Sequence, residues 1–147
     1  MTELPILNKN IIKTYEWLKD IEDSAGFYHD DHKRAIAILR VTLHELRDNL
    51  PLQNLAKLSS QLPLIIRGLL FEGWNPQITP LKERKKDDFL MSIADKIDEK
   101  YNDTDIEEGV KAVFQAIYNH VSTSEIENLK AVLPRGILEL MSELEEI

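Results

Sequence analysis

The sequence predicts an all-helical fold, and three observations support this class. Apolar residues recur three and four positions apart, which is the spacing of one helix face, and no alternating run is long enough for a strand. The apolar pattern also recurs 71 residues later, with Leu62-Pro63 matching Leu133-Pro134. We therefore expect about eight helices in two pseudo-symmetric four-helix repeats, approximately 8–73 and 85–147, with a linker over 74–84.

The repeat rests on further pairs at the same offset, all apolar on apolar. They are Leu39/Val110, Leu43/Phe114, Leu46/Ile117, Leu50/Val121, Leu55/Ile126, Leu58/Leu129, Ile66/Ile137, Leu69/Leu140 and Leu70/Met141. Half of the chain, about 70 residues, is close to the size below which one hydrophobic core barely offsets conformational entropy. The two repeats are therefore expected to share one core in a single domain, 1–147.

Two amphipathic helices are predicted first. One runs from Asn8 to about Ala25, where Gly26 is a plausible stop. The next begins after Asp31, which can act as its N-cap, and continues to about Leu50.

Two short helices are predicted next, because Pro51 and Pro63 each suit a first helical turn, where a missing N–H costs nothing. The second, from Pro63 to about Glu72, is the most apolar segment and has apolar residues on more than one face. We therefore expect it at the centre of the core.

The second repeat follows after Gly73 and Pro76 break the pattern. One helix is predicted from Phe89 to Tyr101. Two Ser/Thr-x-x-Glu pairs and a proline mark three further helix starts: Thr104 with Glu107, Ser122 with Glu125, and Pro134.

Charge and composition exclude several classes of function. The chain has 18 basic and 26 acidic residues, a net charge of -8, a pI near 5.0 and no cysteine. Acidity disfavours nucleic acid as a partner, and the lack of cysteine excludes thiolate metal sites and disulfides. No apolar run approaches the roughly 20 residues that span a bilayer, so we expect a cytoplasmic protein without membrane contact.

Two stretches carry a family resemblance: LHELRDNL from Leu43 to Leu50, and QLPLIIRGLLFEGWNP from Gln61 to Pro76. They resemble a bacterial family called domain of unknown function 2267, and Asp88-Phe89-Leu90 and Leu133-Pro134 also fit its pattern. The resemblance covers nearly the whole chain and implies a small, all-helical bacterial protein. The family has no established activity, so no catalytic or binding residue is carried over.

Binding candidates lie where the two repeats differ, since Arg67, Gly68, Gly73 and Trp74 have no like residue 71 positions later. Arg67 is either a partner anchor or, as we favour, part of an internal pair with a carboxylate such as Glu45 or Asp48. Gly68 costs about 1 kcal/mol within a helix, so we expect another helix to approach it closely, with a ligand contact as the second interpretation. Trp74 is expected to fold back on its own helix, and otherwise to be an exposed hot spot.

Arg47 and a His-Asp-Asp-His cluster are two further candidates. Arg47 and Asp48 are adjacent and so do not face each other on a helix, which predicts surface or cross-helix contacts. His29, Asp31 and His32 could ligate a metal, but their place at a helix start favours capping, and we expect no metal or other cofactor.

No nucleophile and base pair, phosphate loop or cofactor motif is present in the sequence. We therefore expect a non-enzymatic protein-interaction or structural module that binds a protein partner, or a second copy, through Arg67 to Pro76. The alternative is a bundle that binds a small ligand or metal between the two repeats. An enzyme built from scattered Asp, Glu and His residues stays open as a third interpretation.

Overall fold

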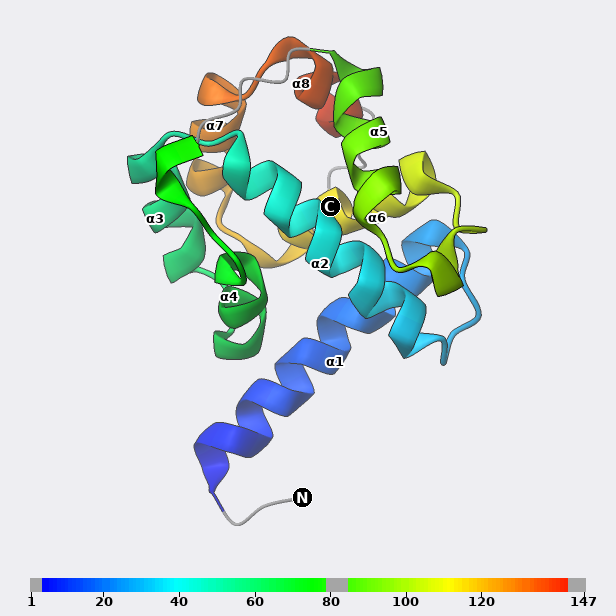
Figure 1. Ribbon diagram of the computed structural model, residues 1–147. Helices are drawn as coiled ribbons and strands as arrows, with labels where there is room; N and C mark the ends of the chain where they lie inside the picture. The colour runs from blue at the N-terminus through cyan, green and yellow to red at the C-terminus, as the bar shows by residue number, and fades with distance from the viewer. Residues whose placement is uncertain (1–3, 79–84, 143–147) are drawn as a thin grey trace.

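The computed structural model describes residues 4–78 and 85–142, and within these ranges it has eight α-helices and no strand (Figure 1). This confirms the predicted all-α class. Parts of the predicted linker, 79–84, and the last residues, 143–147, lie outside the described residues.

The helices follow one another with short connections. In chain order they are α1 (Pro5–Ala25), α2 (His32–Asp48), α3 (Leu52–Ser60), α4 (Leu64–Phe71), the 3-10 turn η1 (Pro76–Ile78), α5 (Lys86–Lys96), the 3-10 turn η2 (Glu99–Tyr101), α6 (Ile106–His120), α7 (Thr123–Val132) and α8 (Arg135–Ser142).

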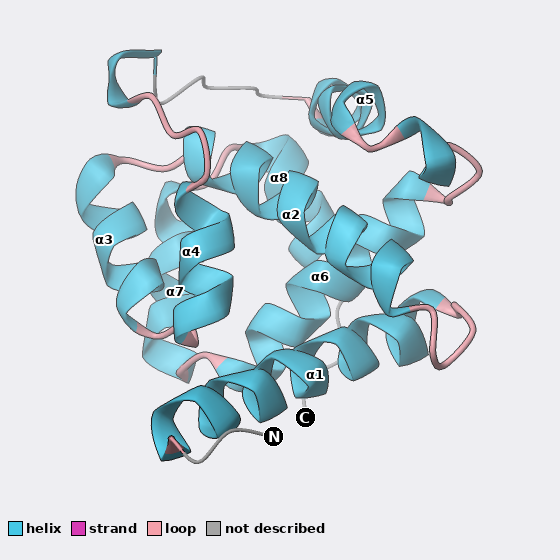
Figure 2. Ribbon diagram, turned by 60° about the horizontal axis from the view of Figure 1, so that its bottom comes forward, coloured by secondary structure: helices cyan, strands magenta, loops and turns pink. Residues whose placement is uncertain are grey.

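Helices α2 and α6 form the centre of the core. Ile38 and Leu39 of α2 and Val110 and Val113 of α6 are fully buried. Helix α1 packs along α6 and also contacts α2 and α4 (Figure 2). The shorter helices surround this centre, with α3, α4 and α7 on one side of α2 and α5 on the other (Figure 1).

The prediction that α4 lies at the centre of the core is wrong. Its buried side is formed by Ile66, Leu69 and Leu70, whereas Leu64 is 49% exposed and Ile65 is 40% exposed. Helix α4 packs against α1, α2 and α3 through this side, and its remaining apolar residues face outward.

Most predicted helix starts are confirmed. Asp31 caps α2 by accepting from the Arg34 amide, Ser122 caps α7 in the same way, and Pro63 immediately precedes α4. The Thr104 and Glu107 box is wrong, because Asp105 is the N-cap of α6. Thr104 instead accepts a hydrogen bond from Nη1 of Arg34 at 2.6 Å.

The single helix predicted from Phe89 to Tyr101 is also wrong, because α5 ends at Lys96 and Ile97 is extended. The Asp98 carboxylate accepts a hydrogen bond from the Lys100 amide and caps η2. A short polar side chain thus competes with the helix for a backbone N–H group, which apolar spacing does not reveal.

Across residues 4–78 and 85–142, no helix combines the length and apolar character that crossing a membrane requires.

Candidate functional site

The end of α4 is held by a buried arginine of α2. Arg47 is 5% exposed, and its Nε and Nη2 donate to the two Asp48 carboxylate oxygens at 2.8 and 3.1 Å. Its Nη1 donates to the backbone oxygens of Leu70 at 2.9 Å and Glu72 at 2.6 Å. The predicted surface position is therefore wrong, whereas the predicted cross-helix contact is present, from Arg47 of α2 to the end of α4. Arg47 also pairs with adjacent Asp48, because a long guanidinium side chain can reach a neighbour that its Cβ does not face.

Two more α2 side chains hold the same end of α4. His44 Nε2 donates to the Leu69 carbonyl at 2.7 Å, and Arg40 Nε pairs with Glu72 Oε1 at 2.9 Å. Burial lowers the pKa of His44, which favours the neutral ring. Arg40, His44 and Arg47 lie about one turn apart on one face of α2. His44 and Arg47 satisfy carbonyl groups that the end of a helix leaves open, and Arg40 binds the Glu72 carboxylate beside them.

Gly73 and Trp74 complete this turn. Gly73 has a φ of 63°, a left-handed conformation that glycine adopts without a steric penalty. Trp74 is partly buried, and its ring meets that of Phe71 at a centroid distance of 5.3 Å. It therefore folds back on its own helix, as the packed interpretation predicts.

Arg67 has carbonyl partners rather than the predicted carboxylates, Glu45 or Asp48. Its Nε donates to Ser59 O at 2.8 Å and its Nη2 to Leu62 O at 3.1 Å. These carbonyls belong to the end of α3 and the turn that follows it, so Arg67 caps the preceding helix.

Gly68 is exposed, and the predicted close approach of another helix is wrong. A Cβ atom built on Gly68 would meet no atom within 4 Å among the described residues. Nothing within this part of the chain therefore requires a glycine at this position.

The residues of the weak metal candidate have other roles. Asp31 caps α2 and pairs with Arg34, whereas His32 contacts the buried Glu22 carboxylate at 2.6 Å. His29 is exposed. No cluster of three potential ligands occurs in the described parts of the chain.

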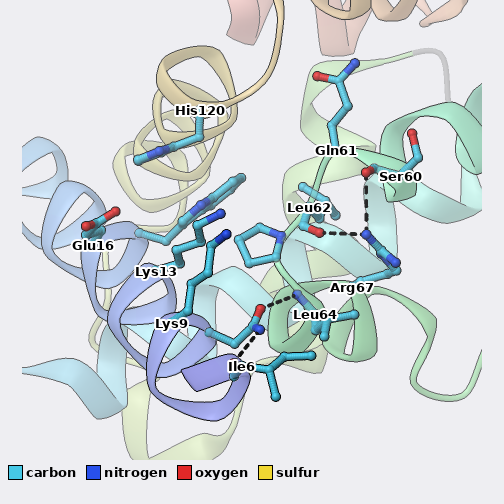
Figure 3. Close-up of a pocket in the computed structure, with 13 residues that line it drawn as sticks. Ile6, Lys9, Lys13, Glu16, Ser60, Gln61, Leu62, Leu64, Arg67 and His120 are labelled. Atoms are coloured by element: carbon cyan, nitrogen blue, oxygen red, sulfur yellow. Dashed lines mark hydrogen bonds between the residues drawn. The ribbon is translucent and has the colours of Figure 1, made fainter. Parts of the chain in front are cut away.

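A cleft of about 470 Å³ lies between α1, the corner that joins α3 to α4, and the end of α6. Lys9 and Lys13 extend from α1 into it, with His120 on the far wall and Arg67 on the α4 side (Figure 3). It combines residues from both predicted repeats, as expected for the small-ligand alternative.

Three sets of contacts fix the walls of this cleft. Asn10 Oδ1 accepts from the Leu64 amide at 3.1 Å, which joins α1 to the start of α4. His120 Nε2 contacts Asp20 at 2.6 Å while its ring stacks on Trp17 at 5.0 Å. Gln61 exchanges two hydrogen bonds with Ser122, at 3.0 and 2.8 Å.

Sequence reasoning did not select Lys9 and Lys13, although their spacing carried a signal. Like charges four positions apart repel each other on a helix, so such a pair is unfavourable unless something compensates it. The spacing of apolar residues does not reveal such a pair of like charges.

Glu125 is a buried carboxylate that the sequence assigned to a capping box. It is 2% exposed, and the Asn128 side chain lies near its carboxylate without forming a hydrogen bond of ordinary geometry. The Ser122 amide, which a capping box would pair with Glu125, donates to Gln61 instead. Burial raises the pKa of Glu125, against the opposing effect of the Lys57 charge.

Replacing Glu125 by glutamine should therefore stabilise the protein at pH 7. A raised carboxyl pKa means that Glu125 keeps its proton to higher pH in the folded state than in the unfolded state. The stability of the protein therefore falls as the pH rises from the unfolded pKa of Glu125 to its folded pKa. The gain from Glu125→Gln should shrink when the pH is lowered below the unfolded pKa of about 4.3. Urea denaturation of wild type and Glu125→Gln at pH 4 and pH 7 measures the gain in the free energy of unfolding at each pH. The control is the exposed Glu127→Gln, and equal effects of the two variants at both pH values would contradict the prediction.

Comparison with known families gives one match. Residues 14–140 match a family described as an uncharacterized conserved protein, DUF2267. The sequence has no match among curated proteins. The matched range includes α2 to α7 and most of α1 and α8.

Proposed function

We propose that this chain, which belongs to the DUF2267 family of uncharacterized conserved proteins, is a non-enzymatic protein-interaction module. Its proposed contact surface is the outer face of α4, which overlaps the Arg67 to Pro76 region. Leu64, Gly68 and Phe71 follow one another at helical spacing on this face, and Ile65 flanks them. Leu64, Ile65 and Gly68 are exposed, and Phe71 is half-buried.

Gly68 is the observation that carries the proposal. A glycine within a helix costs about 1 kcal/mol relative to alanine, and no neighbour among the described residues would be met by a side chain there. Glycine permits another backbone to approach closely. A partner helix that crosses α4 at Gly68 would explain why this apolar helix is both exposed and interrupted by a glycine.

Charge indicates the chemistry of that partner. From Asn49 to Phe71 the chain has two cationic residues, Lys57 and Arg67, and no Asp or Glu, although its net charge is -8. We therefore propose an amphipathic helix of another protein, apolar at its centre and acidic at its edges. The basic surroundings of this face disfavour a second copy of the same face across a two-fold axis.

We also propose that the chain is one domain built from two repeats. Helices α3 and α4 begin at Leu52 and Leu64, and α7 and α8 begin 71 residues later, at Thr123 and Arg135. The first helices of the repeats differ, because α1 has 21 residues and α5 has 11. In this organisation the proposed partner surface belongs to the first repeat alone, since Glu139 stands in place of Gly68.

Two substitutions at Gly68 separate folding from binding. Gly68→Ala should stabilise the fold by about 1 kcal/mol in urea denaturation, because it adds helix propensity without a clash. Gly68→Gln should also fold, but its longer side chain should block a crossing helix. The expected result is a partner that wild type captures in quantitative affinity purification and that Gly68→Gln loses.

Met91→Gln is the matched control for this capture experiment, because Met91 is 62% exposed on α5, away from α4. It should keep the partner. Equal capture by wild type, Gly68→Gln and Met91→Gln would overturn the proposal. Self-association in sedimentation that Gly68→Gln abolishes would identify a second copy as the occupant and would reject the acidic helix.

A further inference from the structure

The cleft described above gathers cationic groups from two helices. Lys9 and Lys13 come from α1 and Arg67 comes from α4, while His120 at the end of α6 lines the opposite wall. Figure 3 shows both lysine side chains extending from α1 into the cleft, while Glu16, the acidic residue of the lining, points away from them. In a chain with a net charge of -8, this is a local concentration of positive charge.

The lysines are available for a ligand. Within residues 4–78 and 85–142, the side-chain ammonium group of neither Lys9 nor Lys13 has a hydrogen bond or ion pair. They lie four positions apart, so their ammonium groups repel each other and the fold gains nothing from holding them together. An anion between them would convert this repulsion into two attractive contacts.

The start of α4 adds to the positive electrostatic potential in the cleft. Pro63 and Leu64 line the cleft at the N-terminal end of α4, which carries the positive end of the helix dipole. The Leu64 amide itself already donates to Asn10, so this end contributes its dipole rather than that N–H group. Arg67 keeps its positive charge while its Nε and Nη2 donate to carbonyls. Lysine ammonium groups, an arginine and a helix start together favour a multiply charged anion over a single carboxylate.

Part of the lining is apolar, and contacts between its residues hold the walls in place. Ile6, Leu62 and Pro63 provide apolar surface, and the indole of Trp17 is held by stacking on His120. The volume of about 470 Å³ exceeds what a free phosphate ion needs and lies in the range of small-molecule sites.

We propose that this cleft binds a small organic phosphate. The phosphate group lies between Lys9, Lys13 and the start of α4, and the organic part lies against Ile6 and Pro63. This site shares Leu64 with the proposed partner face, but Lys9 and Lys13 lie outside that face and Gly68 lies outside the cleft. Variants at these positions therefore test the two proposals separately.

The test is a titration of the full chain with each of three ligands: phenyl phosphate, inorganic phosphate and benzoate. Binding is measured by isothermal titration calorimetry and by changes in amide chemical shifts in NMR spectra. Phenyl phosphate should bind more tightly than inorganic phosphate, which lacks an apolar part, and more tightly than benzoate, which carries one charge. The double variant Lys9→Gln with Lys13→Gln should bind phenyl phosphate about tenfold more weakly or worse. Shifted amides should include those of Lys13 and Leu64.

Lys19→Gln with Lys33→Gln is the matched control, because both lysines are exposed outside the cleft and the change in net charge is the same. This control and Gly68→Gln should both bind phenyl phosphate as wild type does. Absence of saturable binding by wild type below about 10 mM would overturn the proposal. Equal weakening of phenyl phosphate binding in the two double variants would also overturn the proposal, since it would show that only the net charge of the protein attracts the ligand.

Discussion

Replacing Arg47 by methionine is expected to destabilise the fold by about 3 to 5 kcal/mol, measured by urea denaturation. The substitution leaves Asp48 as a buried carboxylate without its partner, and it removes the donor that serves the carbonyls of Leu70 and Glu72. A lone buried charge and two unsatisfied acceptors each carry a desolvation cost.

Arg40→Met is the control for this prediction, since Arg40 lies on the same helix and also binds Glu72. Its side chain is 45% exposed, so the loss should stay below about 1 kcal/mol. If Arg47→Met does not fold, adding Asp48→Asn should restore part of the stability, because the unpaired charge is then removed. Similar losses for Arg47→Met and Arg40→Met would show that the buried pair has no special role.

Gly109→Ala is expected to destabilise the fold by about 2 kcal/mol, the second largest effect. A Cβ atom on Gly109 of α6 would lie 2.8 Å from Cγ1 of Ile38, a fully buried residue of α2. Cγ1 lies close to the backbone of a β-branched side chain, so it cannot move aside without shifting the contact between the two central helices.

The comparison of Gly109→Ala with Gly68→Ala tests this reasoning directly. Both changes add one methyl group to a helical glycine, but only Gly109 has a neighbour that the methyl group would meet. The two variants should therefore shift the free energy of unfolding in opposite directions. A stabilised Gly109→Ala would mean that α2 and α6 can separate slightly at little cost.

Local chemistry in the sequence was enough to place most helices. Pro63 and Ser122 fixed the starts of α4 and α7, because a missing N–H group and a capping hydroxyl act on the nearest turn only. The break at Ile97 was missed because Asp98 competes for a backbone group without disturbing the apolar spacing.

The candidate site could be predicted only in part. Arg67, Gly68, Gly73 and Trp74 were selected because they are unusual, yet Arg67, Gly73 and Trp74 serve the turns at the two ends of α4. Lys9 and Lys13 were not selected, since their significance depends on the α3–α4 corner and on His120, which folding brings beside them.

The sequence by itself therefore determined the helical class, the main helix starts and the identity of most core residues, since these depend on periodicity and on neighbours within about four positions. The tertiary structure decided which helices are central, which glycine is open and which partners the buried Arg47 and Glu45 meet. Arg47 donates to carbonyls 23 and 25 positions away, and the buried Glu45 carboxylate accepts a hydrogen bond from Lys96, 51 positions away. Such partners are set by the packing of whole helices, because a buried charge needs a nearby counter-charge or acceptor regardless of its distance along the chain.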